Sequence, residues 1–231
     1  MIPLHDDNPT QHPPIVTVAL IAVCTLAFLW ELTQGEHVQT RFYQLGVVPA
    51  NLIGGQRLPV DAVLVPAWAT VFTSMFMHGG WMHLIGNMLY LWIFGNNVED
   101  VTGYVRYVVF YLLCGVAAVF AQALPNPESA APMIGASGAI SGVLGAYLLL
   151  YPRAQVLVAI PLGLVIQTMR VPAAYVLIFW FALQLISSLA TSDQQGGVAF
   201  GAHIGGFVAG MALIPLFRRQ DVPLHLFGKR F

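Results

Sequence analysis

Long runs of apolar residues alternate with short polar or proline-containing segments along the 231-residue chain. A helix that crosses a bilayer needs about 20 mostly apolar residues, within a range of roughly 17–25. Six runs approach or reach this length, and each is expected to be a membrane-spanning helix. They are Ile15–Leu32, Trp81–Gly95 with a few preceding residues, Tyr104–Leu124, about Ser137 to Tyr151, Val171–Leu189 and Val198–Phe217. The predicted fold class is therefore all-α: a polytopic membrane protein built as a bundle of six transmembrane helices.

The segments around these runs are expected to be loops and short tails. Met1–Pro14 is polar and lacks the basic region and cleavage site of a signal peptide, so the first apolar run is expected to stay in the mature chain. Thr33–Gly80 is mixed in character and is typical of a long, partly structured loop, whereas the polar run Asn96–Asp100 is expected to end the second span. The chain would then have short cytoplasmic tails at residues 1–14 and 218–231 around a membrane domain at residues 15–217.

One further apolar segment, Val156–Met169, is interrupted by Pro161 and Gly163. It is too short to cross the bilayer and better suits an interfacial hairpin. With six spans, one side of the membrane carries seven of the nine basic residues: Arg106, Arg153, Arg170, Arg218, Arg219, Lys229 and Arg230. The other side carries Arg41 and Arg57. Because basic residues concentrate on the cytoplasmic side, both termini are expected there. A seven-span alternative would reverse this bias unless the N-terminus lay outside.

Composition narrows the class of protein further. Hydrophobic residues make up 58% of the chain and charged residues only 8%, against about 25% charged in an ordinary soluble domain. The formal net charge of −1 provides no basic surface for nucleic acid. Two cysteines, Cys24 and Cys114, lie inside apolar runs and are too few for a disulfide framework or a thiolate metal site.

Polar side chains inside the expected spans are costly in a membrane, so they mark candidate functional positions. His83 and Asn87 lie in the second span, Ser137 and Ser141 in the fourth, and His203 in the sixth. These three spans run in the same direction. At 1.5 Å per residue, four of the side chains, those of His83, Asn87, Ser137 and His203, fall within roughly 10 Å of the outer face.

The spacing of small residues indicates how these spans could meet. Stripes of small residues at four-residue spacing let helix backbones approach closely in membranes. Two such stripes occur, Ser137, Ser141 and Gly145 in the fourth span and Ala202, Gly206 and Gly210 in the sixth. Packing through these stripes would bring Ser137 to His203, which could serve as the base that a serine nucleophile needs. The Ser137 amide, His83 and Asn87 could then stabilise an oxyanion.

Each of these residues also has a purely structural interpretation. A serine in a membrane helix usually bonds the carbonyl four residues before it, and a lone histidine is more often a buried donor between helices. His78, His83 and His203 could in principle bind a metal. However, the chain has no H-E-x-x-H motif, and no carboxylate is expected within the second, fourth or sixth span. The joint pattern, rather than any single residue, favours serine chemistry.

Taken together, three segments resemble the motifs of the rhomboid intramembrane serine proteases, in the same order and spacing across all six spans. The segments are His78-Gly79-Gly80-Trp81-Met82-His83-Leu84-Ile85-Gly86-Asn87, Gly135-Ala136-Ser137-Gly138 and Ala202-His203-Ile204-Gly205-Gly206. The resemblance implies a Ser137–His203 dyad without an acidic third member, and an oxyanion hole made by the Ser137 amide, His83 and Asn87. It also implies supporting roles for His78, Gly135 and Gly138. Many members have an aromatic residue one turn after the nucleophile, on which the histidine stacks, whereas this chain has Ser141 there.

The expected activity is hydrolysis of a peptide bond near the external end of a substrate's transmembrane helix, with no cofactor and no metal. The expected partners are transmembrane-helix proteins and the lipid bilayer, and not nucleic acid. The short termini and the absence of an extra span favour a bacterial plasma (inner) membrane, and an organelle location stays open as an alternative. Two alternatives stay open: a non-catalytic protein of the same architecture that binds transmembrane clients, and a small transporter with His83 and His203 as a proton relay.

Overall fold

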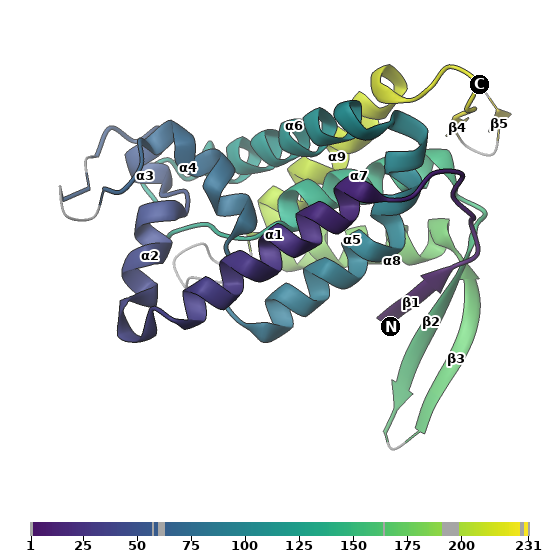
Figure 1. The fold of residues 1–231 in the computed structure, drawn as a ribbon, viewed down its shortest axis with the longest axis horizontal. Coiled ribbons are helices and arrows are strands. Elements are labelled where there is room, and N and C mark those ends of the chain that lie inside the picture. Colours follow the sequence, from purple (N-terminus) through teal and green to yellow (C-terminus); the bar gives the residue numbers. More distant parts are fainter. Residues whose placement is uncertain are drawn as a thin grey trace.

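The structure is a computed structural model that describes residues 2–56, 58–59, 63–163, 165–190, 199–226 and 229–230. Six of its helices correspond to the expected spans and form a bundle (Figure 1). They are α1 (Ile15–Leu32), α5 (Trp81–Thr102), α6 (Tyr104–Ala123), α7 (Ser137–Leu150), α8 (Ala173–Ala190) and α9 (Phe200–Phe217). Within the described residues, α1, α6 and α9 are each long and apolar enough to cross a membrane. The predicted helical membrane bundle is confirmed.

The long segment between α1 and α5 is more regular than a loop. It contains the short helices η1 (Gly35–His37), α2 (Val38–Leu45), α3 (Pro49–Leu52), α4 (Ala67–Thr73) and η3 (Ser74–Phe76). These elements gather at one end of the bundle, and both chain termini lie at the other (Figure 1). An even number of crossings requires the termini to share one side. Two residues used in the sequence predictions, Arg57 on the external side and Val198 at the start of the sixth span, lie outside the described residues.

A small antiparallel sheet covers the end of the bundle that carries the termini. Its strands are β1 (Ile2–Asp6), β2 (Gln155–Leu162) and β3 (Val165–Pro172), in that order, with Ile2 opposite Ala159 and Gln155 opposite Pro172. A second pair is formed by β4 (His225–Leu226) and β5 (Lys229–Arg230). The expected hairpin over Val156–Met169 is confirmed as β2 and β3, which excludes a seventh span there. The sequence predicts no strand at residues 2–6.

The second membrane helix is longer than predicted, because α5 continues from Gly95 to Thr102. The expectation that the polar run Asn96–Asp100 ends this helix is wrong, since the run is hydrogen-bonded rather than solvated. The Glu99 carboxylate is 1% exposed and accepts hydrogen bonds from the backbone N–H groups of Val16 and Thr17 at 2.8 and 2.7 Å. The expected absence of carboxylates from this span is therefore also wrong. Glu99 lies near the C-terminal end of α5, away from His83.

Helix α7 is the short central helix of the bundle. Most of its residues are buried, and it packs against α5, α6, α8 and α9. Its 14 residues span about 21 Å at 1.5 Å per residue, less than the roughly 30 Å of a bilayer's hydrocarbon core. Its first residue, Ser137, therefore starts below the level that a full-length spanning helix reaches.

The closest packing in the bundle is between α7 and α9. A Cβ atom on Gly206 or Gly210 would overlap the backbone carbonyls of Gly138 or Gly142, respectively, and a Cβ on Gly145 would overlap the carbonyl of Phe207. The predicted small-residue contact is thus present. On α7 it runs through Gly138 and Gly142, which are each one residue after the expected Ser137 and Ser141. Because the contact is centred one residue further along α7, the Ser137 side chain lies at its edge, where it can reach a side chain of α9.

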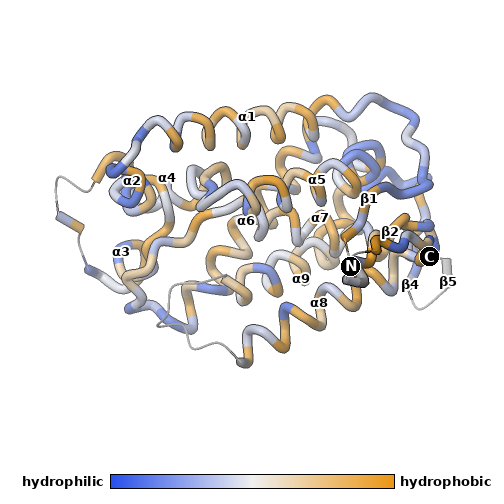
Figure 2. Tube along the Cα trace, turned by 90° about the horizontal axis from the view of Figure 1, so that it is seen from below, coloured by the Kyte–Doolittle hydropathy of each residue, from blue (hydrophilic) through white to orange (hydrophobic). Residues whose placement is uncertain are grey.

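Polarity follows the same organisation along the chain trace. Figure 2 shows hydrophobic residues along the bodies of the long helices and hydrophilic residues mostly at the two ends of the bundle. Cys24 and Cys114 are buried and form no disulfide, as expected. Ser137, at the start of α7, is thus a polar residue that lies toward one end of a largely apolar bundle.

Candidate active site

Ser137 and His203 meet where α7 and α9 begin. Ser137 is the first residue of α7, and His203 is the fourth residue of α9. The Ser137 Oγ lies 2.7 Å from the His203 Nε2. By contrast, the Ser141 hydroxyl donates to the Ser137 carbonyl at 2.6 Å, the bond that a serine usually makes in a membrane helix. Ser141 therefore has the purely structural role of a serine in a membrane helix, whereas the Ser137 hydroxyl faces the His203 imidazole.

The other ring nitrogen of His203 has a partner that the sequence prediction missed. The His203 Nδ1 lies 2.7 Å from the Oε1 of Gln184, in α8. The ring of Trp180, also in α8, lies 5.9 Å from the imidazole between centroids, at an interplanar angle of 35°. Ser141 offers no ring for stacking, and these α8 residues hold the imidazole instead. The signal for Gln184 was its polarity inside an otherwise apolar span, which marks a functional candidate by default.

His83, in the first turn of α5, turns its Nε2 toward the start of α7. The Gly79 backbone N–H donates to the His83 Nδ1 at 3.3 Å, so the proton of the neutral ring is on Nε2. A Cβ on Gly135 would lie only 2.7 Å from that Nε2 and 3.5 Å from the Ser137 Oγ. Gly135 also has a φ of 128°, which side chains rarely adopt. A glycine at this position lets the donor approach the serine.

Asn87 lies one turn after His83 on α5 and is 9% exposed. Its Nδ2 is buried and makes no hydrogen bond to any part of the chain that the structure describes. A buried amide donor without a partner is rare and suggests a missing acceptor. The Ser137 backbone N–H, at the first position of α7, likewise has no partner within the helix. These donors, with His83, are the three predicted for the oxyanion.

His78 supports His83 through packing. It is fully buried, and its ring lies 5.2 Å from the His83 ring in an edge-on arrangement. Its backbone N–H donates to the carboxylate of Glu31, in the last turn of α1, at 3.1 Å, and its Nδ1 lies 3.1 Å from the Phe76 carbonyl. Glu31 was not singled out in the sequence. These contacts fix the loop that leads into α5.

Gly138 lies directly after the serine and supports the close packing of its helix. A Cβ there would lie 2.6 Å from the Cβ of Ala118 on α6. Any larger residue would push α7 away from α6 next to Ser137. Gly138 thus affects where Ser137 lies.

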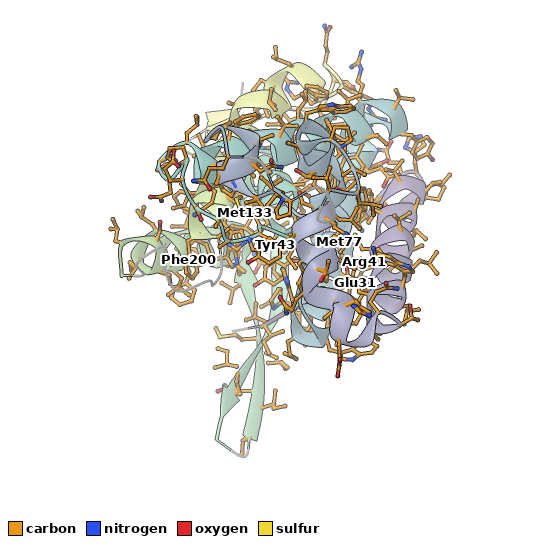
Figure 3. All side chains as sticks on the ribbon, turned by 90° about the vertical axis from the view of Figure 1, so that its left-hand side faces the viewer. Glu31, Arg41, Tyr43, Met77, Met133 and Phe200 are labelled. Carbon is orange, nitrogen blue, oxygen red and sulfur yellow. The ribbon has the colours of Figure 1, made fainter. Side chains whose placement is uncertain are left out.

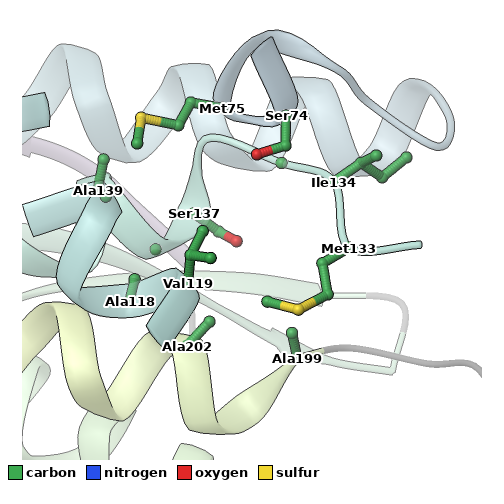
Figure 4. A pocket seen from close by; sticks show the side chains of 13 residues that line it. Ser74, Met75, Ala118, Val119, Met133, Ile134, Ser137, Ala139, Ala199 and Ala202 are labelled. Atoms are coloured by element: carbon green, nitrogen blue, oxygen red, sulfur yellow. The ribbon is translucent and has the colours of Figure 1, made fainter. Parts of the chain in front are cut away.

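A pocket opens beside the Ser137 hydroxyl (Figure 4). Its walls are small and apolar for the most part, with two methionines and one further serine. The lining residues are Ser74, Met75, Gly115, Ala118, Val119, Met133, Ile134, Gly135, Ser137, Gly138, Ala139, Ala199 and Ala202. Figure 3 looks at the bundle from the end that carries α2 and α3, and Met133 and Phe200 are both seen there. The pocket is thus placed toward that end.

The site has no arrangement suited to a metal. Among the residues that the structure describes, no group of three or more His, Cys, Asp or Glu side chains lies close enough to hold an ion. The chemistry that the geometry can perform is proton transfer between Ser137 and His203 beside three hydrogen-bond donors.

Comparisons with known proteins point to one family. The family model of the Rhomboid domain matches residues 66–220, which is more than half of the chain. The chain is 34% identical over 148 residues to the "Rhomboid protease GluP" of Bacillus subtilis, covering 63% of this chain and 26% of that protein. It is 26% identical over 205 residues to the mitochondrial "Rhomboid protein 1" of Saccharomyces cerevisiae, covering 87% and 52%. A third relative, the chloroplastic "Rhomboid-like protein 11" of Arabidopsis thaliana, is 40% identical over 78 residues, covering 34% and 28%.

The chain thus spans between about a quarter and about half of the length of these relatives. Two of these relatives are named as mitochondrial and chloroplastic proteins, and the third comes from a bacterium. The membrane-spanning helices indicate an integral membrane protein, and the comparisons do not support the expected bacterial plasma membrane.

Proposed function

Since this chain belongs to the rhomboid family, we propose that it is an intramembrane serine endopeptidase in which Ser137 is the nucleophile and His203 the base. The observation that carries this proposal is the 2.7 Å separation of the Ser137 Oγ and the His203 Nε2. A serine hydroxyl is a weak nucleophile until a neighbouring base removes its proton. In this chain the base comes from a second helix that is in backbone contact with the first.

In the proposed reaction, the Ser137 Oγ attacks the carbonyl carbon of the substrate while its proton moves to the His203 Nε2. The tetrahedral intermediate then collapses, the C–N bond breaks, and the same proton passes to the leaving amine. A water molecule next gives a proton to His203 and attacks the acyl-enzyme carbonyl. This attack forms a second tetrahedral intermediate. When that intermediate collapses, the new carboxyl end leaves and His203 returns the proton to Ser137.

The negative oxygen of each intermediate would be stabilised by the Ser137 N–H, the His83 Nε2–H and the Asn87 Nδ2–H. Such donors act strongly in a site of low dielectric, because they are already oriented before the charge forms. The positive end of the α7 dipole adds to this effect at the same place. The unpartnered Nδ2 of Asn87 supports the assignment, since an oxyanion would be the acceptor that it lacks.

The substrates that fit this site are transmembrane proteins cut near the external end of a membrane helix. A peptide bond within an intact helix has its carbonyl hydrogen-bonded and shielded, so the segment must unwind before it is cut. Glycine, proline or small residues near the cut favour unwinding. The pocket beside Ser137, with its alanine and glycine walls, suits a small side chain next to the cut bond.

We further propose that the membrane domain extends over residues 15–217, with both termini on the side that carries most basic residues. The catalytic end of the bundle then faces away from that side. The reaction needs no metal and no cofactor, because every proton transfer is between Ser137, His203, water and the substrate.

Labelling with a fluorophosphonate tests the proposal most directly. Detergent-solubilised wild-type protein should be labelled, whereas Ser137→Ala and His203→Ala should not. Circular dichroism on all three proteins checks that each is folded. A folded wild-type protein that is not labelled would overturn the proposal and favour a non-catalytic member that binds transmembrane clients. Cleavage of a reconstituted transmembrane substrate would then identify the cut position.

A further inference from the structure

The side chain of Gln184 reaches the catalytic base from a third helix. We propose that Gln184 is a positioning residue, which holds His203 in the tautomer and orientation that the reaction requires. This inference rests on the proposed function, and it assigns to α8 a residue of the catalytic arrangement beyond the two-residue dyad. Its basis is the 2.7 Å contact of the Gln184 Oε1 with the His203 Nδ1, together with the 2.7 Å contact of the His203 Nε2 with Ser137.

The two contacts together select one tautomer of the neutral imidazole. A neutral histidine carries its proton on one ring nitrogen and a lone pair on the other. An amide oxygen can only accept, so it favours the proton on Nδ1 and leaves the lone pair on Nε2, facing the Ser137 hydroxyl. Turning the amide by 180° would present its NH₂ to Nδ1 and move the proton to Nε2. His203 could then no longer accept the serine proton.

An amide suits this position better than the carboxylate of a soluble serine protease. A carboxylate beside the imidazole would bring a charge into an apolar environment at a high desolvation cost. Glutamine offers an acceptor of similar geometry and no charge. Its neighbour Trp180 packs over the imidazole from the same helix, so one face of α8 supplies both the hydrogen bond and the ring contact.

The arrangement also spreads the site over three helices. Ser137 belongs to α7, His203 to α9 and Gln184 to α8, and no two of them share a helix. The α7–α9 distance is set by backbone contact, whereas α8 is held through side chains such as Phe181, which stacks on Phe207 at 4.6 Å between centroids. A shift of α8 by about 1 Å would stretch the Gln184–His203 hydrogen bond beyond its normal range.

Replacing Gln184 by methionine and by glutamate tests the inference. Gln184→Met keeps the shape and removes the acceptor, and kcat should fall about tenfold with KM unchanged, the effect of one lost hydrogen bond. Gln184→Glu restores an acceptor oxygen to the His203 Nδ1, and it should recover part of the kcat that Gln184→Met loses. Leu185→Ala, at a neighbouring exposed position on α8, is the matched control and should behave as wild type. Unchanged kcat in a folded Gln184→Met protein would overturn the inference.

A spectroscopic measurement separates this inference from the proposed function. Nitrogen-15 NMR of histidine-labelled Ser137→Ala protein reports the tautomer without any turnover, and the His203 signals are those absent from a further His203→Gln variant. We expect a protonated Nδ1 that loses its bias in Gln184→Met. An inactive wild-type protein with this tautomer would refute the protease and keep the positioning role. A protonated Nε2 in the presence of Gln184 would refute the positioning role whatever the activity.

Discussion

His83 faces the start of α7, and Asn87 lies one turn after it on the same helix, but the two side chains are held differently. His83 is fixed by Gly79 and by the ring of His78, whereas the Nδ2 of Asn87 has no partner among the described residues. An unpaired buried donor is costly in the resting protein. We propose that the oxyanion formed during the reaction is the acceptor for this donor.

Removing this donor should therefore affect the rate and not the fold. We expect Asn87→Ala to lower kcat about 10²-fold, the usual effect of losing one oxyanion donor, with the same unfolding temperature or a slightly higher one. The measurement is turnover of a reconstituted substrate beside thermal unfolding in detergent. Asn96→Ala makes the same change in the other half of α5, where the Asn96 side chain accepts the Asn97 N–H, and should leave kcat unchanged.

Gly135 and Gly86 provide a second matched pair. Gly135→Ala places a Cβ 2.7 Å from the His83 Nε2 at a φ of 128°, so we expect fluorophosphonate labelling to be lost. The unfolding free energy should fall by about 1–3 kcal/mol from backbone strain. A Cβ on Gly86 would meet no atom within 4 Å, and Gly86→Ala should be labelled as wild type. Normal labelling of Gly135→Ala would contradict the donor role of His83.

Much of the residue pattern at this site could be predicted, because Ser137, His203, His83 and Asn87 are polar groups at similar depth in a membrane. Gln184 could not be assigned from sequence, because its partner lies 19 positions away on another helix. Its role depends on the rotation of α8, which the apolar pattern of that span does not specify. Glu31 was missed because its carboxylate bonds a backbone N–H 47 residues away, and that contact leaves no motif.

At the scale of elements, α1 begins against a side chain from α5 rather than against a cap of its own. The residue before α1, Pro14, provides no side-chain cap, and the Glu99 carboxylate bonds the N–H groups of Val16 and Thr17. The Thr17 hydroxyl donates to the same carboxylate at 2.6 Å. The buried Glu99 side chain thus accepts hydrogen bonds from free N–H groups at the start of α1, and it connects α1 to α5.

Truncating this side chain should destabilise the bundle. We expect Glu99→Ala to lower the unfolding free energy by about 3 kcal/mol, because buried donors lose a charged partner. Unfolding by a graded denaturant in micelles measures the change. Glu36→Ala, at an exposed position of η1, removes the same charge without these contacts and should have no effect. Equal stability of the two variants would contradict the capping role.

The hairpin of β2 and β3 extends sideways from the end of the bundle that carries the termini (Figure 1). Val165 and Ile166, near its tip, are 65% and 69% exposed. Exposed apolar side chains at the level of the membrane–water interface are expected to insert into the lipid headgroup region. A fluorescent label on Ile166→Cys should therefore be quenched by nitroxide lipids in vesicles.

The control for this experiment is a label on Glu36→Cys, in the exposed η1 helix. Its emission should be insensitive to the same lipids. Both native cysteines are buried, so they need not be replaced. Equal quenching at the two positions would contradict the interfacial placement of the hairpin.

The hairpin shows what sequence can and cannot provide for an element. Length and the interruption by Pro161 and Gly163 predict that the segment turns back. By contrast, β1 could not be predicted, because five residues carry too weak a pattern and their partners in β2 lie 150 or more positions away. The end of α5 was misjudged for a related reason, since its polar run is satisfied by residues of the N-terminal segment.

At the scale of the whole molecule, the N-terminal strand is connected to α7, the helix that begins with Ser137. The Tyr147 hydroxyl, in α7, donates to the carboxylate of Asp6 at 2.6 Å, and Asp6 is 4% exposed. Burial raises the pKa of Asp6 above its ordinary value of 3.8, and the hydrogen bond from Tyr147 opposes this shift only in part. The charged form is therefore disfavoured in the folded protein.

The sign of the pH dependence follows from this shift. Stability from Asp6 is fully present below its ordinary pKa and is lost as pH rises through the raised value. Asp6→Asn has no charge to bury, so its unfolding temperature relative to wild type should increase as pH rises from 4 toward 8. Asp221→Asn, at an exposed position, is the control. A constant difference across this range would contradict the buried-charge explanation.

The backbone contact between α7 and α9 determines how the bundle responds to bilayers of different composition. Gly206 and Gly210 touch the carbonyls of α7 directly, so no compressible layer of side chains separates the two helices. A thicker, thinner or more tightly packed bilayer changes the lateral force on the helix bundle. The helices should then shift most where they contact each other through flexible side chains. The separation of Ser137 and His203 is therefore expected to depend little on the bilayer. The contact of Gln184 with His203 is expected to depend on it more, because α8 is held through side chains.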